Sequence, residues 1–241
     1  MRARQLREPA ARGRLLWQLL TGALGDVTQP GRPPLVLDCG GGSGRFAVPL
    51  AEMGADVTVV DISADALATL RRRAADAAVG DRIHALQGDV EALAHHIAGR
   101  VFDLGLAHEL LETVDDPAAA LQSIATAVRP GGGLVSVLVV NPIGQVLARV
   151  LAGDLVAARD ELRRWAEGVH TGLDPAAVTW LCQQARLTVQ QAHGIGVFAE
   201  LLPGPDADPG MLSDLEELAA ARPPYREIAA RFHVIARRSA G

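Results

Sequence analysis

The sequence predicts an α/β fold with a doubly wound, mostly parallel sheet. Short runs of valine and leucine alternate along the chain with alanine-rich amphipathic stretches, which is the pattern of repeated strand–helix units. The first of these runs ends in an aspartate and continues into a glycine-rich turn at 38–44, the usual start of a nucleotide-binding sheet. A length of 241 residues fits one domain, 1–241.

The first 140 residues predict five strands with intervening helices. Ser63 can cap the helix after the second strand, because a serine oxygen accepts from free amides at a helix start. The proline and glycines of 129–133 end the helix before the fifth strand. The expected strands are 35–39, 57–61, 83–87, 102–107 and 134–140, and the expected helices are 10–25, one from 44, 64–78 and 117–128.

The pattern changes after residue 140. Asn141-Pro142 interrupts the fifth strand, and 141–175 resembles a helical insertion over the carboxyl edge of the sheet, where open α/β sheets bind ligands. No crossover helix is evident between the last two strands, so we expect a seven-stranded Rossmann-like sheet whose final strand is antiparallel. The remaining expected elements are helices 144–167 and 174–185, a strand 187–191, a loop 202–210 and a strand 231–238.

Composition excludes several classes of chemistry. The chain has a net charge of −5 and no lysine, which excludes lysine Schiff bases and P-loop lysines and favours no polyanionic partner. Cys39 and Cys182 form no CxxC pair, so we expect no metal site. No apolar run is long enough to span a bilayer and the N-terminus lacks a signal core, so we expect a cytoplasmic protein without a membrane partner.

The glycine loop carries the first candidate site. Its glycines at 40, 42 and 44 depart from the dinucleotide pattern G-x-G-x-x-G, because Arg45 stands where the third glycine belongs. A carboxylate at Asp38 would repel a pyrophosphate but can hold the amino group of a methionine tail, directly or through water. The alternative is a plain strand–turn–helix connection. The expected cofactor residues here are Asp38, Gly40, Gly41 and Gly42.

Two further aspartates follow strands of the predicted sheet. Asp61 ends the second strand, where a carboxylate can accept hydrogen bonds from both ribose hydroxyls; its alternative role is in the turn itself. Asp89 follows the third strand and can accept from an adenine amine, with Ile62 and Val90 beside the ring. Its alternative role is the N-cap of a helix at 90–97.

These residues resemble class I S-adenosylmethionine-dependent methyltransferases. The resemblance implies S-adenosyl-L-methionine as cofactor, S-adenosyl-L-homocysteine as product and no metal. The motifs that carry it are Val36–Gly44, Val59–Ser63, Gln87–Val90, Phe102–His108 and Ala127–Gly132.

A narrower resemblance extends almost end to end. The chain is similar to bacterial tRNA methyltransferases that esterify the carboxymethoxy group of a wobble uridine. In that family the arginine matching Arg12 holds the methionine carboxylate, and 108–112 matches a His-x-x-Leu-Glu motif. The chain departs from the family where acids offset the arginines of 154–168, where Val140 replaces an aromatic residue and where Ala199 replaces a histidine.

His108 is the candidate catalytic residue. It ends the fourth strand, where it can contact the cofactor or act as a base for a phenol or amine acceptor; the alternative is a capping histidine. A carboxylate acceptor needs no base. We predict methyl transfer to a carboxylate or hydroxyl oxygen of a small molecule, because clustered cations for phosphates are scarce. The alternatives are a tRNA carboxymethoxyuridine methyltransferase, a nicotinamide-dependent oxidoreductase and a non-catalytic cofactor-binding protein.

Overall fold

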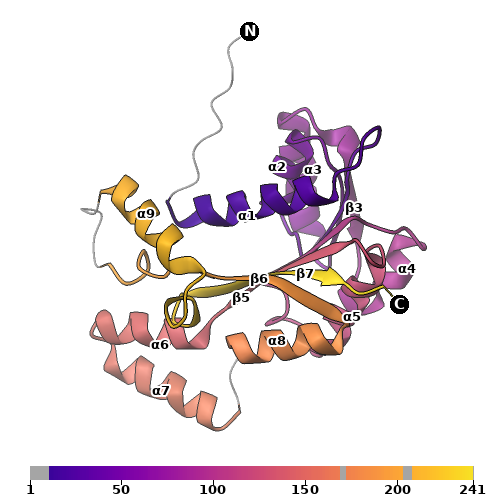
Figure 1. The fold of residues 1–241 in the computed structure, drawn as a ribbon. Helices are drawn as coiled ribbons and strands as arrows, with labels where there is room; N and C mark the ends of the chain where they lie inside the picture. Colours follow the sequence, from indigo (N-terminus) through magenta and orange to yellow (C-terminus); the bar gives the residue numbers. More distant parts are fainter. Residues whose placement is uncertain (1–10, 169–171, 203–207, 241) are drawn as a thin grey trace. The chain divides into compact units, whose positions relative to one another are not determined.

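The computed structural model describes residues 11–168, 172–202 and 208–240, with the side chains of residues 11 and 12 left out (Figure 1). Helices and strands alternate, as the sequence predicts. The helices are α1 Ala11–Val27, α2 Ala47–Glu52, α3 Ala64–Asp76, α4 Leu93–Ile97, α5 Pro117–Ala127, α6 Pro142–Leu151, α7 Leu155–Ala166, α8 Pro175–Gln184 and α9 Pro209–Ala220. The strands are β1 Leu35–Cys39, β2 Asp56–Asp61, β3 Ile83–Gln87, β4 Leu104–His108, β5 Leu134–Val140, β6 Leu187–Ile195 and β7 Arg231–Arg238.

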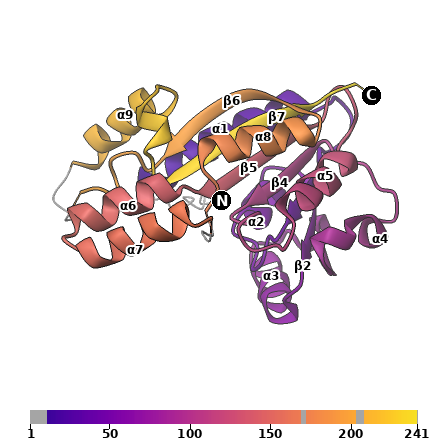
Figure 2. The same cartoon turned by 90° about the horizontal axis from the view of Figure 1, so that it is seen from below.

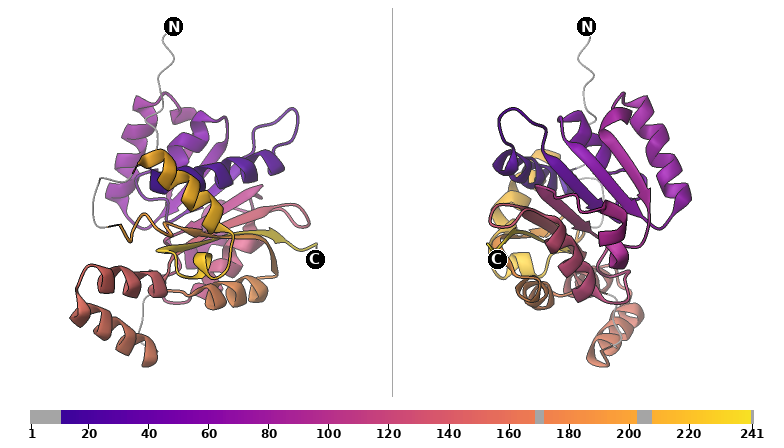
Figure 3. Two further views of the ribbon diagram at one scale, coloured as in Figure 1. Left: turned by 60° about the vertical axis from the view of Figure 1, so that its left-hand side comes forward. Right: turned by 90° about the vertical axis from the view of Figure 1, so that its right-hand side faces the viewer.

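The seven strands form one sheet in the order β3-β2-β1-β4-β5-β7-β6. β1 to β5 pair in parallel and β7 runs antiparallel to its neighbours, which confirms the predicted sheet. Figure 3 shows the strands of the first half side by side, with helices packed along them. β1, β2, β4 and β5 are buried almost throughout, because central parallel strands are covered on both faces, whereas β3 at the edge is half-exposed.

The chain divides into two compact units, each described here by itself. The larger unit contains 23–139, 176–191 and 234–241, and the smaller contains the chain up to Gly22, 140–175 and 192–233. In the larger unit α2 and α3 pack against β2, and α5 packs against β4. Ser63 caps α3 as predicted, with its Oγ accepting from the amide of Ala66 at 3.2 Å.

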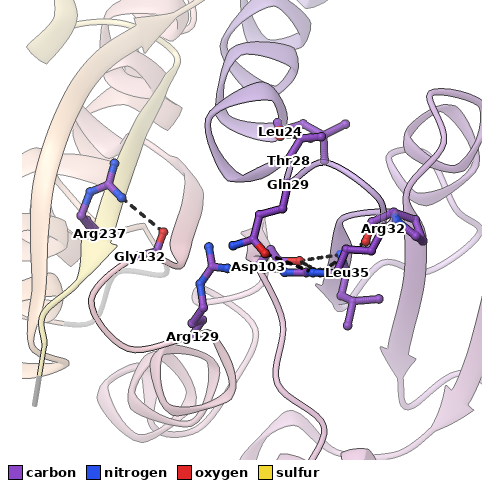
Figure 4. Close-up of polar contacts among 10 residues, drawn as sticks. Leu24, Thr28, Gln29, Arg32, Leu35, Asp103, Arg129, Gly132 and Arg237 are labelled. Carbon is purple, nitrogen blue, oxygen red and sulfur yellow. Dashed lines mark hydrogen bonds and ion pairs between the residues drawn. The ribbon is translucent and has the colours of Figure 1, made fainter.

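An ion-pair cluster fixes the start of β4 in the larger unit (Figure 4). The two carboxylate oxygens of Asp103 accept from Arg32 Nη1 at 2.6 Å and Nη2 at 2.7 Å, and Arg129 Nη1 lies 3.2 Å from Oδ1. The amide of Leu35 donates to Oδ2 at 3.0 Å. These contacts hold the pKa of Asp103 below its ordinary value despite the opposing effect of burial.

The predicted helix 144–167 is wrong in its continuity, because the smaller unit has two helices there. Figure 2 shows α6 and α7 lying side by side as a hairpin. The helical conformation is interrupted at Gly153, whose φ of +78° falls in the left-handed region that glycine tolerates. Asp154 then caps α7 by accepting from the amide of Ala157 at 3.0 Å. The placement of 141–175 over the carboxyl edge of the sheet stays a prediction.

The base of this hairpin is tied to the segment before β7. The side-chain amide of Asn141 donates to the carbonyls of Glu227 and Ala229, both at 2.8 Å, while its oxygen accepts from Ile143. Gly144 passes so close that an added Cβ would lie 2.3 Å from the Ala229 carbonyl oxygen. The start of α6 is therefore fixed by backbone contacts.

Helix α9 is absent from the sequence prediction. Asp208 caps it, accepting from the amide of Met211 at 2.7 Å. The buried carboxylate of Glu216 on α9 accepts from three consecutive amides, of residues 197 to 199, at 2.7 to 2.8 Å. Three such bonds satisfy the buried charge and hold this segment against α9.

Candidate cofactor site

The glycine loop leaves β1 and bends sharply toward α2. The amide of Gly40, whose φ is +69°, donates to the carbonyl of Val60 at 2.8 Å and so ties the loop to the end of β2. An added Cβ at Gly41 would lie 2.5 Å from Asp38 Oδ2 and 2.9 Å from Val59 Cγ1. The loop therefore has no space for a side chain at this position.

Asp38 lies under the loop and is 1% exposed. Its Oδ2 accepts no hydrogen bond from any residue that the structure describes. Burial, and then the charge of Asp61, raise the pKa of Asp38 to about 7. A carboxyl in this state gains stability from a cation that enters its surroundings.

Asp61 ends β2 and contacts the loop directly. Its Oδ2 accepts from the amide of Gly42 and its Oδ1 from the amide of Ser63, both at 2.8 Å. The turn role that the sequence left as the alternative is thus present. Each carboxylate oxygen has a second lone pair, so the same group can also accept from ligand hydroxyls.

A cavity of about 400 Å³ opens beside these residues within the larger unit. Such a volume is in the range of small-molecule sites. Five carboxylates line the cavity, together with apolar side chains and the glycine loop. The lining residues are Gly40, Val60, Asp61, Ile62, Gly88, Asp89, Val90, Glu91, Glu109, Leu110, Thr113, Val114 and Asp115.

The three residues predicted to surround adenine, Ile62, Asp89 and Val90, all line this cavity. Ile62 is 72% exposed and Val90 is 5% exposed, so one apolar side chain is free to cover a ligand and the other forms a wall. Asp89 Oδ1 accepts from the amide of Glu91 at 2.9 Å and caps a 3₁₀ turn at Val90–Ala92. The capping alternative is therefore present, and Oδ2 accepts no hydrogen bond within the described chain.

His108 is buried and does not line the cavity. Its Nε2 lies 2.8 Å from Ser136 Oγ, and its ring forms a T-shaped pair with that of Phe46, with the ring centroids 4.6 Å apart. Burial, and then the charge of Arg45, lower the pKa of His108 to about 3. The imidazole is neutral at physiological pH and is a weak base there, and its catalytic role stays an untested prediction.

Sequence reasoning missed three cavity acids, Glu91, Glu109 and Asp115. Glu109 follows β4 with a φ of +52°, a left-handed conformation that is costly for glutamate and that places it at the cavity. No pattern in the sequence marks such a conformation. The His-x-x-Leu-Glu motif that begins at His108 covers this position but does not specify the residue type at 109.

Three further expectations concern Arg12, a metal site and a membrane-spanning helix. Arg12 belongs to α1, but its side chain lies outside the described residues. Within 11–168, 172–202 and 208–240, no three histidine, cysteine or acidic side chains gather as metal ligands. Over the same residues, every helix is too short or too polar to cross a bilayer.

Comparisons with known proteins place the chain in a family. A family model described as a methyltransferase domain matches residues 37–136. A ubiquinone biosynthesis O-methyltransferase of Azotobacter vinelandii is 35% identical over 164 residues, which are 66% of this chain and 67% of that protein. The chain belongs to the S-adenosylmethionine-dependent methyltransferases. The matched segment of this methyltransferase contains every residue that lines the cavity.

Two further similarities cover more of the methyltransferase. A tRNA 5-carboxymethoxyuridine methyltransferase of Escherichia coli K12 is 29% identical over 231 residues, which are 93% of this chain and 87% of that protein. The crystal structure of magnesium protoporphyrin IX methyltransferase from Synechocystis PCC 6803, with bound S-adenosylhomocysteine, has a TM-score of 0.58 at 15% identity. It covers 95% of this chain and 82% of its own. The predicted family, fold and cofactor are confirmed.

Proposed function

We propose that this methyltransferase transfers a methyl group to a carboxylate or hydroxyl oxygen of a small molecule. The observation that carries the cofactor site is the acidic cavity beside the glycine loop, with the unpartnered Asp38 Oδ2 beneath that loop. Carboxylates attract a sulfonium and an ammonium and repel a pyrophosphate. The chemistry of the cavity thus favours S-adenosylmethionine over a nicotinamide dinucleotide.

The proposed contacts follow from the position of each group. Asp61 would accept from the ribose hydroxyls through its remaining lone pairs, and Asp89 from the adenine amine through Oδ2. Ile62 and Val90 would cover the two faces of the ring. Asp38 would face the ammonium of the methionine tail. The family resemblance adds Arg12 for the methionine carboxylate.

The acceptor chemistry is consistent with a site that lacks a strong base. Bound S-adenosylmethionine supplies a methyl group already activated by the sulfonium, so positioning of the acceptor oxygen provides much of the acceleration. The low pKa of His108 makes it a poor proton acceptor at neutral pH. A carboxylate, which is already ionised, suits such a site better than an amine.

The charges of the α6–α7 hairpin favour a small acceptor. Arg159 pairs with Asp160 at 2.9 Å, and Arg164 pairs with Glu161. Nucleic acids require several cations free to meet successive phosphates, and these pairs reduce that number. The second candidate is carboxymethoxyuridine in tRNA, which the end-to-end similarity to the Escherichia coli enzyme supports.

Two experiments test the proposal. Calorimetry should detect S-adenosylhomocysteine binding that NAD does not displace, and NAD binding without affinity for S-adenosylhomocysteine would refute the cofactor site. Transfer of a labelled methyl group should then be measured with a metabolite extract and with bulk tRNA. Labelled tRNA, together with tRNA binding that falls steeply with salt, would establish the second candidate.

A further inference from the structure

The smaller unit contains a second cavity, of about 290 Å³, within the α6–α7 insertion. Its lining combines two apolar residues, Val140 and Pro142, with polar and charged side chains of the two helices. The lining residues are Val140, Pro142, Gln145, Arg149, Glu161, Arg164 and Gly172. A pocket with an apolar wall and a few convergent polar groups is the usual form of a small-molecule site.

The donors in this cavity outnumber their acceptors. Gln145 and Arg149 lie one turn apart on α6 and so share one face of the helix. Arg149 Nη2 is 3.9 Å from Glu161 Oε2, beyond hydrogen-bond distance, and the buried Arg149 Nε has no acceptor among the described residues. An unsatisfied buried N–H is costly. The Arg149 side chain as a whole is 39% exposed, so its guanidinium can also donate to an acceptor that enters the cavity.

The net charge limits what this acceptor can be. The three charged residues that line the cavity are Arg149, Arg164 and Glu161, which together carry one excess positive charge. Glu161, whose side chain is 14% exposed, is paired with Arg164. One excess positive charge suits a single monoanionic group. A planar guanidinium fork matches the two oxygens of a carboxylate, and Gln145 offers further amide donors.

We propose that this cavity binds one carboxylate group of a small molecule, with Arg149 as its main partner. The apolar skeleton of the ligand would lie against Val140 and Pro142. This carboxylate site does not depend on the function proposed above.

Ligand-observed NMR titration tests the site with benzoate as the probe and neutral benzamide as its isostere. Benzoate should bind and benzamide should bind at least tenfold more weakly. Arg149→Gln should weaken benzoate at least tenfold, and Glu161→Gln should tighten it severalfold by removing the competing carboxylate. Arg159→Gln is the matched control, because Arg159 is on the same hairpin, is paired with Asp160 and does not line the cavity.

Each variant is first checked by circular dichroism, thermal melting and its affinity for S-adenosylhomocysteine, which none of the substitutions should change. Equal binding of benzamide, or unchanged benzoate affinity in a folded Arg149→Gln variant, would overturn the proposal. Tighter binding of inorganic phosphate through the same arginine would overturn the carboxylate assignment. If benzoate does not bind while S-adenosylhomocysteine does, only this carboxylate site is refuted. If S-adenosylhomocysteine does not bind, the proposed function is refuted.

Discussion

Asp38 should make cofactor binding depend on pH near neutrality. Its pKa of about 7 in the free protein places it far above the ordinary aspartate value, so the folded state holds a proton that the unfolded state has lost. In the proposed site the carboxylate form of Asp38 would attract the ammonium of the cofactor, whereas the protonated form would not. Affinity for S-adenosylhomocysteine should therefore fall as the pH falls below 7.

The size of the effect follows from the ionised fraction. With a pKa of about 7, roughly half of Asp38 is ionised at pH 7 and roughly 3% at pH 5.5. If only the ionised form binds, the dissociation constant should rise about 15-fold between pH 7 and pH 5.5. This range also leaves the amino group of the ligand protonated.

Calorimetry across this range, in buffers of different ionisation enthalpy, measures both the affinity and the protons released. The Asp38→Asn variant should bind S-adenosylhomocysteine more weakly than the wild type at pH 7, and its affinity should change little with pH. A wild-type affinity that does not change with pH, together with unchanged affinity in a folded Asp38→Asn protein, would refute the role of this carboxylate. A pH dependence that persists in the variant would assign the titration to another group.

Three further perturbations test other parts of the structure. Asp103→Asn should lower the free energy of unfolding by about 2 kcal/mol at pH 7, because the ion pair to the half-exposed Arg32 is lost. The pKa of Asp103 is lowered in the folded state, so the difference in free energy of unfolding between wild type and variant should depend on pH. Denaturant titrations should show the difference above about pH 4 and its loss in stronger acid. An equal difference at pH 2 would contradict this. Gly41→Ala should abolish S-adenosylhomocysteine binding while the protein still melts cooperatively, because the methyl group would lie 2.5 Å from a carboxylate oxygen, and near-normal affinity would be the contrary result. Glu216→Gln should expose 197–199 to faster hydrogen exchange, since an amide oxygen cannot hold three N–H groups as strongly as a carboxylate, and unchanged protection would remove that role.

Much of the sheet could be predicted because burial and sequence pattern agree there. The strands β1, β3, β5 and β7 have the predicted bounds, whereas β4 begins two residues later than expected and β6 continues to Ile195. Central strands such as β1 and β5 are buried on both faces, and they produce apolar runs that are easy to detect. The carboxyl ends of such strands can be predicted as well. For that reason Asp38 and Asp61 could be placed at the edge of the sheet from the sequence.

The features that were not predicted depend on local backbone conformations that the amino-acid pattern does not specify. The break at Gly153 was passed over because an isolated glycine is tolerated within a helix, although Asp154 offered a cap. Helix α9 was missed because its first turn contains Pro209 and Gly210, which also suit a loop. The left-handed backbone at Glu109 and the packing of α6 on α7 depend on tertiary structure, so neither cavity's full lining could be derived.

The attachment of the α6–α7 hairpin is independent of the side chains that cover most of its length. Asn141 and Gly144 hold the start of α6 through main-chain groups of 227–230, which are indifferent to the side chains farther along the hairpin. Side chains farther along α6 and α7 can therefore be substituted without loosening this attachment, provided that Asn141, Gly144 and their carbonyl partners are retained.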